Sequence, residues 1–327
     1  MKLTENVGGH ASLVSLCLGL AAALCLLAAC SSTSHDPVPD TRYQLGQAQP
    51  DALANPRAAP DTVAEPTGPF AHWAAVVVAG DNAASGGGTT QAFDNARKDV
   101  AKALVRAGFA EDHIAQFSSH PADDDPTRRA LADVDAVRGE LHRLLADAGA
   151  GCLIYVTSHG NVNGIMFGEK LASTSDIAGL ADKTCGMRPT VMILSACHSG
   201  IFVQPLQAPN RLVLTAARSD RSSFGCGVSN KYPYFDQCMI ESLPTTANFI
   251  TLADRVKACV AHMEEAGHFA PPSEPQLSIG SAIEPTLAQD DFANAAPAAT
   301  TVACAAATST ACHTRAAAAG AKKAATN

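Results

Sequence analysis

Four continuous apolar runs, separated by stretches with helical periodicity, are the feature that most limits what this chain can fold into. The runs are Trp73–Ala79, Cys152–Thr157, Val191–Leu194 and Arg211–Thr215. A strand buried on both faces of a sheet has this continuous pattern, whereas a half-exposed strand alternates polar and apolar residues. Buried strands that alternate with helices form a mostly parallel sheet with helices on both faces. We therefore expect an α/β fold built as a three-layer αβα sandwich.

Apolar residues at helical spacing predict the segments between these strands. Asp125 can cap a helix, and Pro126 suits its first position. The predicted helices are residues 93–107, a helix opening at Asp125-Pro126 and running through Leu131 to Ala148, a short helix over 176–183, and a helix from Thr251 to Gly267. A short strand is expected over 114–117.

The first thirty residues have the pattern of an export signal. An apolar run over residues 11–29 follows Lys2 and ends in Leu-Ala-Ala-Cys30, with Ser31 and further polar residues after it. This sequence resembles the lipobox of bacterial lipoproteins, which implies cleavage before Cys30 and lipidation of that cysteine, so that acyl chains anchor the protein in a membrane. Ser31 resembles the sorting residue of outer-membrane lipoproteins, so we expect a bacterial cell envelope location, facing the periplasm or the surface. The alternative is a plain transmembrane helix, because the run is near the lower length limit for a span.

Composition divides the rest of the chain into three parts. Residues 30–69 are rich in Pro, Ala, Asp and Thr and have no sustained periodicity, so we expect a disordered tether after the 1–29 signal. Residues 286–327 form an Ala-rich, low-complexity tail without an apolar stripe, which leaves 70–285 as the folded domain. The formal net charge of −8 argues against a nucleic-acid partner, which would select a basic face.

A potential catalytic pair follows two of the predicted strands. The second apolar run continues into Ser158-His159-Gly160, and the third into Ser195-Ala196-Cys197-His198. Parallel strands bring both ends to the same edge of the sheet, where ligands of open α/β sheets bind. A nearby imidazole favours the thiolate of a cysteine, and it can protonate the leaving amine after the thiolate attacks a carbonyl. The amides of Gly160 and Cys197 can then donate to the developing oxyanion.

These motifs resemble the caspase-like cysteine peptidases, and most closely the legumain family, peptidase family C13. The resemblance rests on Ser-His159-Gly160 and Ala-Cys197-His-Ser-Gly, each behind an apolar strand, on the Val-Ala-Gly that ends the first strand, and on the segment from Thr215 to Cys226. It implies a caspase-like fold, cleavage of protein or peptide substrates by Cys197 with His159 as acid and base, and no cofactor.

The resemblance also indicates where substrate-binding residues should lie. Legumains have an acidic residue just before the Ala-Cys pair, where this chain has Ser195, and a second one near the position of Ser229. The asparagine pocket of the family is therefore not reproduced. The family's third catalytic partner and a basic pocket residue come from the region after the first strand, where Asn82, Asn95 and Arg97 are the candidates.

Other interpretations of these residues remain open at the level of sequence. Cys197, His198 and His159 could bind zinc, although no fourth ligand has metal-like spacing. The enzyme could transfer its acyl group to an amine, as in the related glycosylphosphatidylinositol transamidase. A non-catalytic envelope lipoprotein could use the same cleft to bind peptides.

Eight cysteines follow Cys30, at positions 152, 185, 197, 226, 238, 259, 304 and 312. Their pairing does not follow from the sequence. We interpret Cys152, inside a buried strand, as an inert apolar residue. Cys226 and Cys238 flank one loop and are a candidate pair, and Cys304 could pair with Cys312 in an oxidising compartment.

Overall fold

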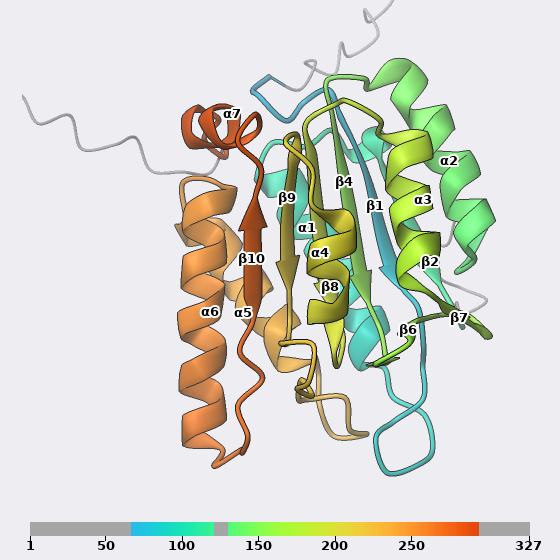
Figure 1. The fold of residues 1–327 in the computed structure, drawn as a ribbon, viewed down its shortest axis with the longest axis vertical. Helices are drawn as coiled ribbons and strands as arrows, with labels where there is room; N and C mark the ends of the chain where they lie inside the picture. Colours follow the sequence, from blue (N-terminus) through green and yellow to red (C-terminus); the bar gives the residue numbers. More distant parts are fainter. Residues whose placement is uncertain (1–66, 121–129, 294–327) are drawn as a thin grey trace, which may run out of the picture. The chain divides into compact units, whose positions relative to one another are not determined.

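The computed structural model describes residues 67–120 and 130–293, except for the side chain of Ala130. A central sheet of seven strands has the order β10-β9-β8-β4-β1-β2-β3 (Figure 1). All neighbouring strands are parallel except β10, which runs antiparallel to β9. The strands are β1 (Trp73–Ala79), β2 (Ile114–Ser118), β3 (Ala130–Leu131), β4 (Gly151–Thr157), β8 (Thr190–Ser195), β9 (Arg211–Thr215) and β10 (Gln276–Ile279).

A second, smaller sheet follows β4 at the carboxyl edge of the main sheet. It has three antiparallel strands, β5 (Gly160–Asn161), β6 (Gly164–Phe167) and β7 (Lys170–Ala172). In Figure 1 the carboxyl ends of β1, β4, β8 and β9 all lie at the lower edge, next to β6 and β7. The sequence analysis did not predict this small sheet, because its strands are short and carry no sustained alternation.

Helices cover both faces of the main sheet, as predicted. The side chains of β1 alternate between the two faces, so Trp73, Ala75 and Val77 enter one core and Ala74, Val76 and Val78 the other. The first core contains α1 (Ala92–Arg106), α5 (Tyr234–Ser242), α6 (Phe249–Ala266) and α7 (Glu284–Gln289). The second contains α2 (Val134–Asp147), α3 (Thr174–Thr184) and α4 (Val203–Leu206). Single turns η1 (Glu111–His113), η2 (Ser199–Phe202) and η3 (Leu243–Thr245) complete the described elements.

One predicted helix start needs correction. Asp125 and Pro126 lie outside the described residues, and α2 begins only at Val134. Asp133 caps this helix, because its carboxylate accepts hydrogen bonds from the N–H groups of Asp135 and Ala136. Leu131, predicted on the apolar stripe of the helix, lies in β3 and is exposed. The apolar spacing therefore placed the start of the helix too early.

Two disulfide bonds correct the predictions about cysteines. Cys152 is not an inert apolar residue but joins β4 to Cys185, at the end of α3. Cys238 on α5 pairs with Cys259 on α6, so the candidate pair with Cys226 is wrong. Among the described cysteines, Cys197 and Cys226 are free.

The packed part of the chain continues past the predicted end at Pro285. Leu287 of α7 and Phe292 are buried in the first core, and the ring of Phe292 packs against Phe249 with their centroids 4.9 Å apart. In the described parts of the chain, no helix is long and apolar enough to cross a membrane. Cys30, the predicted tether and the two tail cysteines lie outside the described residues.

Candidate active site

The structure brings the His159 and Cys197 segments together at the carboxyl edge of the sheet. Strands β4 and β8 are parallel neighbours, and Thr157 of β4 lies opposite Ser195 of β8. Strands β4 and β8 therefore end at the same level of the sheet. Gly160 then lies directly against the loop after β8, because a Cβ atom built on it would be only 2.5 Å from the carbonyl oxygen of Cys197.

The imidazole of His159 is oriented by the loop that follows β1. Its Nε2 lies 2.9 Å from the carbonyl oxygen of Ala83, and its ring packs edge-on against Phe93 at 5.1 Å between centroids. A carbonyl oxygen can only accept, so Nε2 carries the proton and Nδ1 is the acceptor. A backbone carbonyl at Ala83 thus holds the ring in the tautomer that can take a proton at Nδ1.

The thiol of Cys197 is half-buried and lies beside the segment that follows β9. The N–H of Ser223 donates to Sγ at 3.3 Å, and the Ser223 hydroxyl lies 3.6 Å away. The thiol in turn donates to the carbonyl oxygen of Ser223 at 3.5 Å. Cys197 is therefore placed as a nucleophile would be, in contact with polar groups at a sheet edge.

His198, the neighbour of Cys197, faces the segment over residues 218–221 instead. It has a left-handed backbone with φ 58°, its N–H donates to Arg221 O at 2.8 Å, and Nδ1 lies 3.0 Å from Ser219 O. Within the described residues, no group of three His, Cys, Asp or Glu side chains is arranged to hold a metal ion.

Within the described residues, two backbone N–H groups near the ends of β4 and β8, those of Gly160 and Cys197, have no hydrogen-bond partner. Met166 N donates to His159 O at 2.8 Å, so His159–Met166 and Asn161–Gly164 are the hydrogen-bonded pairs between β5 and β6. Gly160 lies between them in a non-hydrogen-bonded pair with Ile165, so its N–H points away from β6. In the described part of the chain, Cys197 N–H makes no hydrogen bond either. These two amides are the groups that the sequence analysis assigned to an oxyanion hole.

The carboxyl group of Asp236, on α5, lies beneath the two strand ends and was missed by the sequence analysis. It is fully buried and accepts hydrogen bonds from the hydroxyls of Tyr155, Thr157 (2.9 Å) and Ser195 (2.7 Å). Burial raises the pKa of Asp236 to about 6, against the opposing effect of these hydrogen bonds. The pKa of Tyr155 is also raised, by burial and then by the neighbouring carboxylate.

Two of the predicted substrate-binding residues are turned into the protein. Ser195 is 2 % exposed and donates to Asp236, so its hydroxyl is not available to a substrate. Arg97 is fully buried, where it forms an ion pair with Asp94 at 2.9 Å and donates to Gln116. Burial raises the pKa of Asp94, but the hydrogen bonds and charge of Arg97 outweigh it, so the net shift is downward. Both side chains therefore make contacts within the fold around the site.

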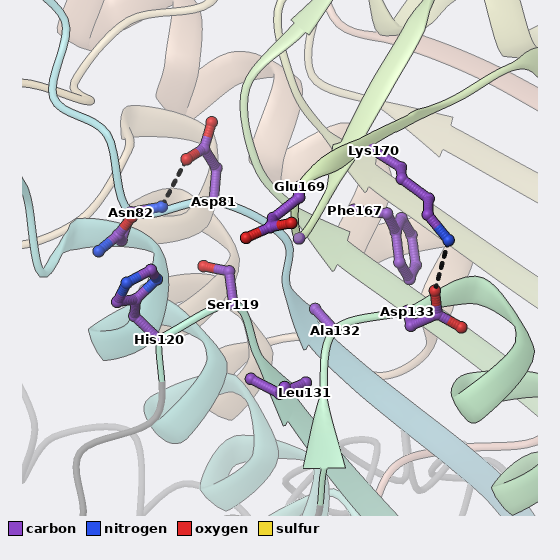
Figure 2. A pocket seen from close by; sticks show the side chains of 11 residues that line it. Asp81, Asn82, Ser119, His120, Leu131, Ala132, Asp133, Phe167, Glu169 and Lys170 are labelled. Atoms are coloured by element: carbon purple, nitrogen blue, oxygen red, sulfur yellow. Dashed lines mark hydrogen bonds and ion pairs between the residues drawn. The ribbon is translucent and has the colours of Figure 1, made fainter. Parts of the chain in front are cut away.

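The other predicted residues lie on the loops around the site. Asn82 borders a cavity of about 430 Å³ at the ends of β1 and β2, which Figure 2 shows with Asp81 and Glu169 on its walls. Neither His159 nor Cys197 lines this cavity. Ser229 is exposed in the turn after Gly227. The side chain of Asn95 donates to Lys231 O at 3.1 Å and not to His159.

The glycine-rich loop after β1 is hydrogen-bonded to the loop before α5. Ser85 N donates to Cys226 O at 3.0 Å, and Thr90 Oγ1 to Gly227 O at 3.1 Å. Burial raises the pKa of the free Cys226 thiol, and the nearby Cys197 adds to this shift. The two loops thus form a connected wall that carries both the Ala83 carbonyl and the residues next to Cys197.

An ion-pair cluster stabilises the segment that His198 contacts. Arg218 pairs with Asp220 at 2.5 Å and with Glu274 at 2.6 Å, and Arg221 also contacts Asp220. The hydrogen bond from Arg218 is the main reason that the pKa of Asp220 is lowered to about 2.

Comparison with protein families agrees with this arrangement. Residues 133–258 match the model of the Peptidase C13 family, a segment that includes His159, Cys197 and Asp236. Over these residues the chain is similar to the Peptidase C13 family. The expected resemblance to this family of cysteine peptidases is therefore confirmed over residues 133–258, which include both motifs.

A solved structure of caspase-1 from Spodoptera frugiperda is similar to this chain at 14% sequence identity, with a TM-score of 0.47. The match covers 64% of this chain and 87% of the caspase. No curated protein matches the sequence. The αβα architecture follows from the strand order and the two helical layers of the chain itself.

Proposed function

We propose that this protein is a cysteine endopeptidase that cleaves peptide bonds with Cys197 as nucleophile and His159 as general acid and base. The single observation that carries the proposal is the contact between the two segments at Gly160, with the His159 imidazole held by Ala83 O. A nucleophile and a base that is itself oriented by a third group form the usual arrangement for covalent catalysis.

The proposed reaction proceeds in two steps. Nδ1 of His159 takes the proton of the Cys197 thiol, the thiolate attacks the scissile carbonyl, and the amides of Gly160 and Cys197 bind the oxyanion. His159 then gives its proton to the leaving amine, which departs. Water, deprotonated by His159, attacks the thioester, releases the acid product and restores the thiol. If an amine attacks in place of water, the same thioester gives a transpeptidation product.

We also propose that the protein acts outside the cytoplasm, anchored to the bacterial envelope through a lipid on Cys30. The Leu-Ala-Ala-Cys30 sequence supports the anchor. The two disulfides, Cys152–Cys185 and Cys238–Cys259, support export, because such bonds form and persist in oxidising compartments.

The test is a peptide library varied at the residue before the scissile bond, incubated with the protein from Ser31 onward beside Cys197→Ala and His159→Ala. Reductant is kept low enough to preserve the two disulfides. We expect cleavage by the wild type only. A preference other than Asn would fit a chain with Ser195 and Ser229 where the family has acidic residues.

Two outcomes would contradict the proposal. Equal cleavage by Cys197→Ala would exclude the thiolate mechanism. No cleavage and no labelling of Cys197 by a peptidyl electrophile, together with retained peptide binding, would favour the non-catalytic binding protein. Added amine nucleophiles distinguish hydrolysis from transfer, since only a transpeptidase forms the new amide in high yield.

A further inference from the structure

Asp236 is a buried acid that the proposed mechanism does not use. It lies on α5, on the face of the sheet opposite α2 and α3, and its residue is 0 % exposed. Three hydroxyl groups donate to it: Tyr155 and Thr157 from β4, and Ser195 from β8. Within the described residues these are its side-chain partners, and Tyr155 is the one titratable group among them.

The positions of these partners connect Asp236 to the candidate site. Thr157 and Ser195 face each other across β4 and β8, and both donate to the same oxygen, Oδ2, at 2.9 and 2.7 Å. Thr157 is two residues before His159, and Ser195 is two residues before Cys197. The carboxyl group therefore joins the two strands at the last point where both are still in the sheet.

We propose that Asp236 is a positioning residue for the dyad: by binding Thr157 and Ser195 through one oxygen, it fixes the separation of the strand ends that carry His159 and Cys197. This inference rests on the proposed function for its catalytic consequence. A displacement of about 1 Å at reacting groups can lower a rate about 10²-fold. A link between the two strands at this point can therefore have a large effect on kcat.

The composition of the two strands supports a dedicated role. Hydroxyl side chains in otherwise apolar, fully buried strands need a partner, because an unpaired buried polar group costs about 1–3 kcal/mol. An apolar side chain at Thr157 or Ser195 would fit these strands without any partner. The chain instead has a carboxyl group on α5 whose burial raises its pKa to about 6.

The experiment compares Asp236→Ala and Asp236→Asn with Thr157→Val, Ser195→Ala and the double variant of Thr157 and Ser195. The readouts are kcat and KM on the best library peptide. We expect Asp236→Ala to lower kcat at least about tenfold with KM within about twofold, because a fully buried side chain does not contact the substrate. The double variant should lose nearly as much kcat as Asp236→Ala. Its loss should be smaller than the sum of the two single losses, because both hydroxyls bind the same carboxyl group. Asp236→Asn keeps an acceptor and adds donors that the hydroxyls can accept, so it should retain most of kcat.

A matched control separates positioning from general loss of stability. Thr190→Val removes a buried hydroxyl at the other end of β8, where it donates to Arg188 O. This variant should lower Tm as Ser195→Ala does and leave kcat unchanged. If Thr190→Val and Ser195→Ala lower kcat equally at equal Tm, or if the folded Asp236→Ala keeps wild-type kcat, the proposal is overturned.

A second readout does not require peptidase activity. The rate of Cys197 alkylation by iodoacetamide, followed by mass spectrometry of the Cys197 peptide, is measured against pH. In the double variant this pH profile should differ from that of the wild type, because the separation of His159 from Cys197 changes. If the wild type cleaves no peptide but this profile moves, the proposed function fails and the positioning role stands. An unmoved profile in a folded double variant overturns the positioning role.

Discussion

At Gly160 the segment that carries His159 contacts the segment that carries Cys197, and the contact leaves no room for a side chain. A methyl group there would lie 2.5 Å from Cys197 O and 3.0 Å from Cβ of Ala196, so Gly160→Ala must push the His159 and Cys197 segments apart. We expect a loss of about 1–3 kcal/mol in the free energy of unfolding and a fall in kcat of at least about tenfold. Urea denaturation and peptide cleavage measure the two effects.

Gly139→Ala is the matched control. Gly139 lies within α2, and a Cβ atom built on it meets nothing within 4 Å. The substitution should stabilise the protein by roughly 0.5–1 kcal/mol and leave cleavage unchanged. Full activity in Gly160→Ala would show that the close contact is not needed for catalysis.

Asp236 should give the protein a distinctive dependence of stability on pH. Its pKa is about 6 in the folded protein and 3.8 ordinarily, so between these values the folded state binds more protons than the unfolded state. Stability due to this group is thus fully present below pH 3.8 and is lost as pH rises through 6, by about 3 kcal/mol. Asp236→Asn removes this slope, so the variant should gain stability relative to the wild type between pH 4.5 and 7 in urea titrations. Parallel curves for the two proteins would contradict the raised pKa.

The sequence predicted that His159 and Cys197 lie at one edge of the sheet, but it did not predict Asp236 beneath them, for a physical reason. His159 and Cys197 each follow a continuous apolar run, and parallel strands must bring such ends together. Asp236 lies in α5, which carries no recognisable motif, so the neighbouring sequence gives no sign of its role. One signal was available: Thr157 and Ser195 are polar residues in buried strands, and they require a buried partner. In the structure Ser195 is buried and donates to Asp236, whereas the resemblance to legumains predicted a substrate-binding residue.

At the level of elements, the parallel strands and their helices followed from periodicity, whereas the edges of the sheet did not. The short β3 and the antiparallel β10 have no apolar run of their own, and they are fixed by pairing with β2 and β9. The disulfide pairing could not be predicted from the sequence either, because it depends on which elements pack together. Cys238 meets Cys259 because α5 packs along α6.

The Cys238–Cys259 bond should stabilise the helix that carries Asp236. It closes a loop with a sequence separation of 21 residues, and chain entropy predicts that the double variant Cys238→Ala/Cys259→Ala loses roughly 3 kcal/mol of unfolding free energy. Urea unfolding without reductant measures this loss. A reductant should destabilise the variant further, through the remaining Cys152–Cys185 bond. Equal stability of wild type and variant without reductant would show that the pair does not form.

At the level of the whole molecule, a packed domain follows N-terminal residues that carry the proposed lipid attachment site, Cys30. The packed cores run from Phe70 to Phe292, and no described helix is suited to span a bilayer. The two hypotheses for the N-terminal residues, a lipid on Cys30 and an uncleaved apolar helix, make different predictions for one substitution.

We expect Cys30→Ala to abolish lipid labelling when the full chain is expressed in a Gram-negative bacterium with radiolabelled palmitate, since that cysteine would carry the acyl chains. The wild type should be labelled, lack residues 1–29 by mass spectrometry and sediment with outer membranes. Cys304→Ala is the control, because it removes a cysteine far from the Leu-Ala-Ala-Cys30 sequence and should stay labelled. One acyl chain binds a membrane only marginally, whereas several bind stably, so loss of label should coincide with loss of the mature form from the membrane. An unlabelled wild type that remains in the membrane with residues 1–29 intact would instead establish the apolar helix as the anchor.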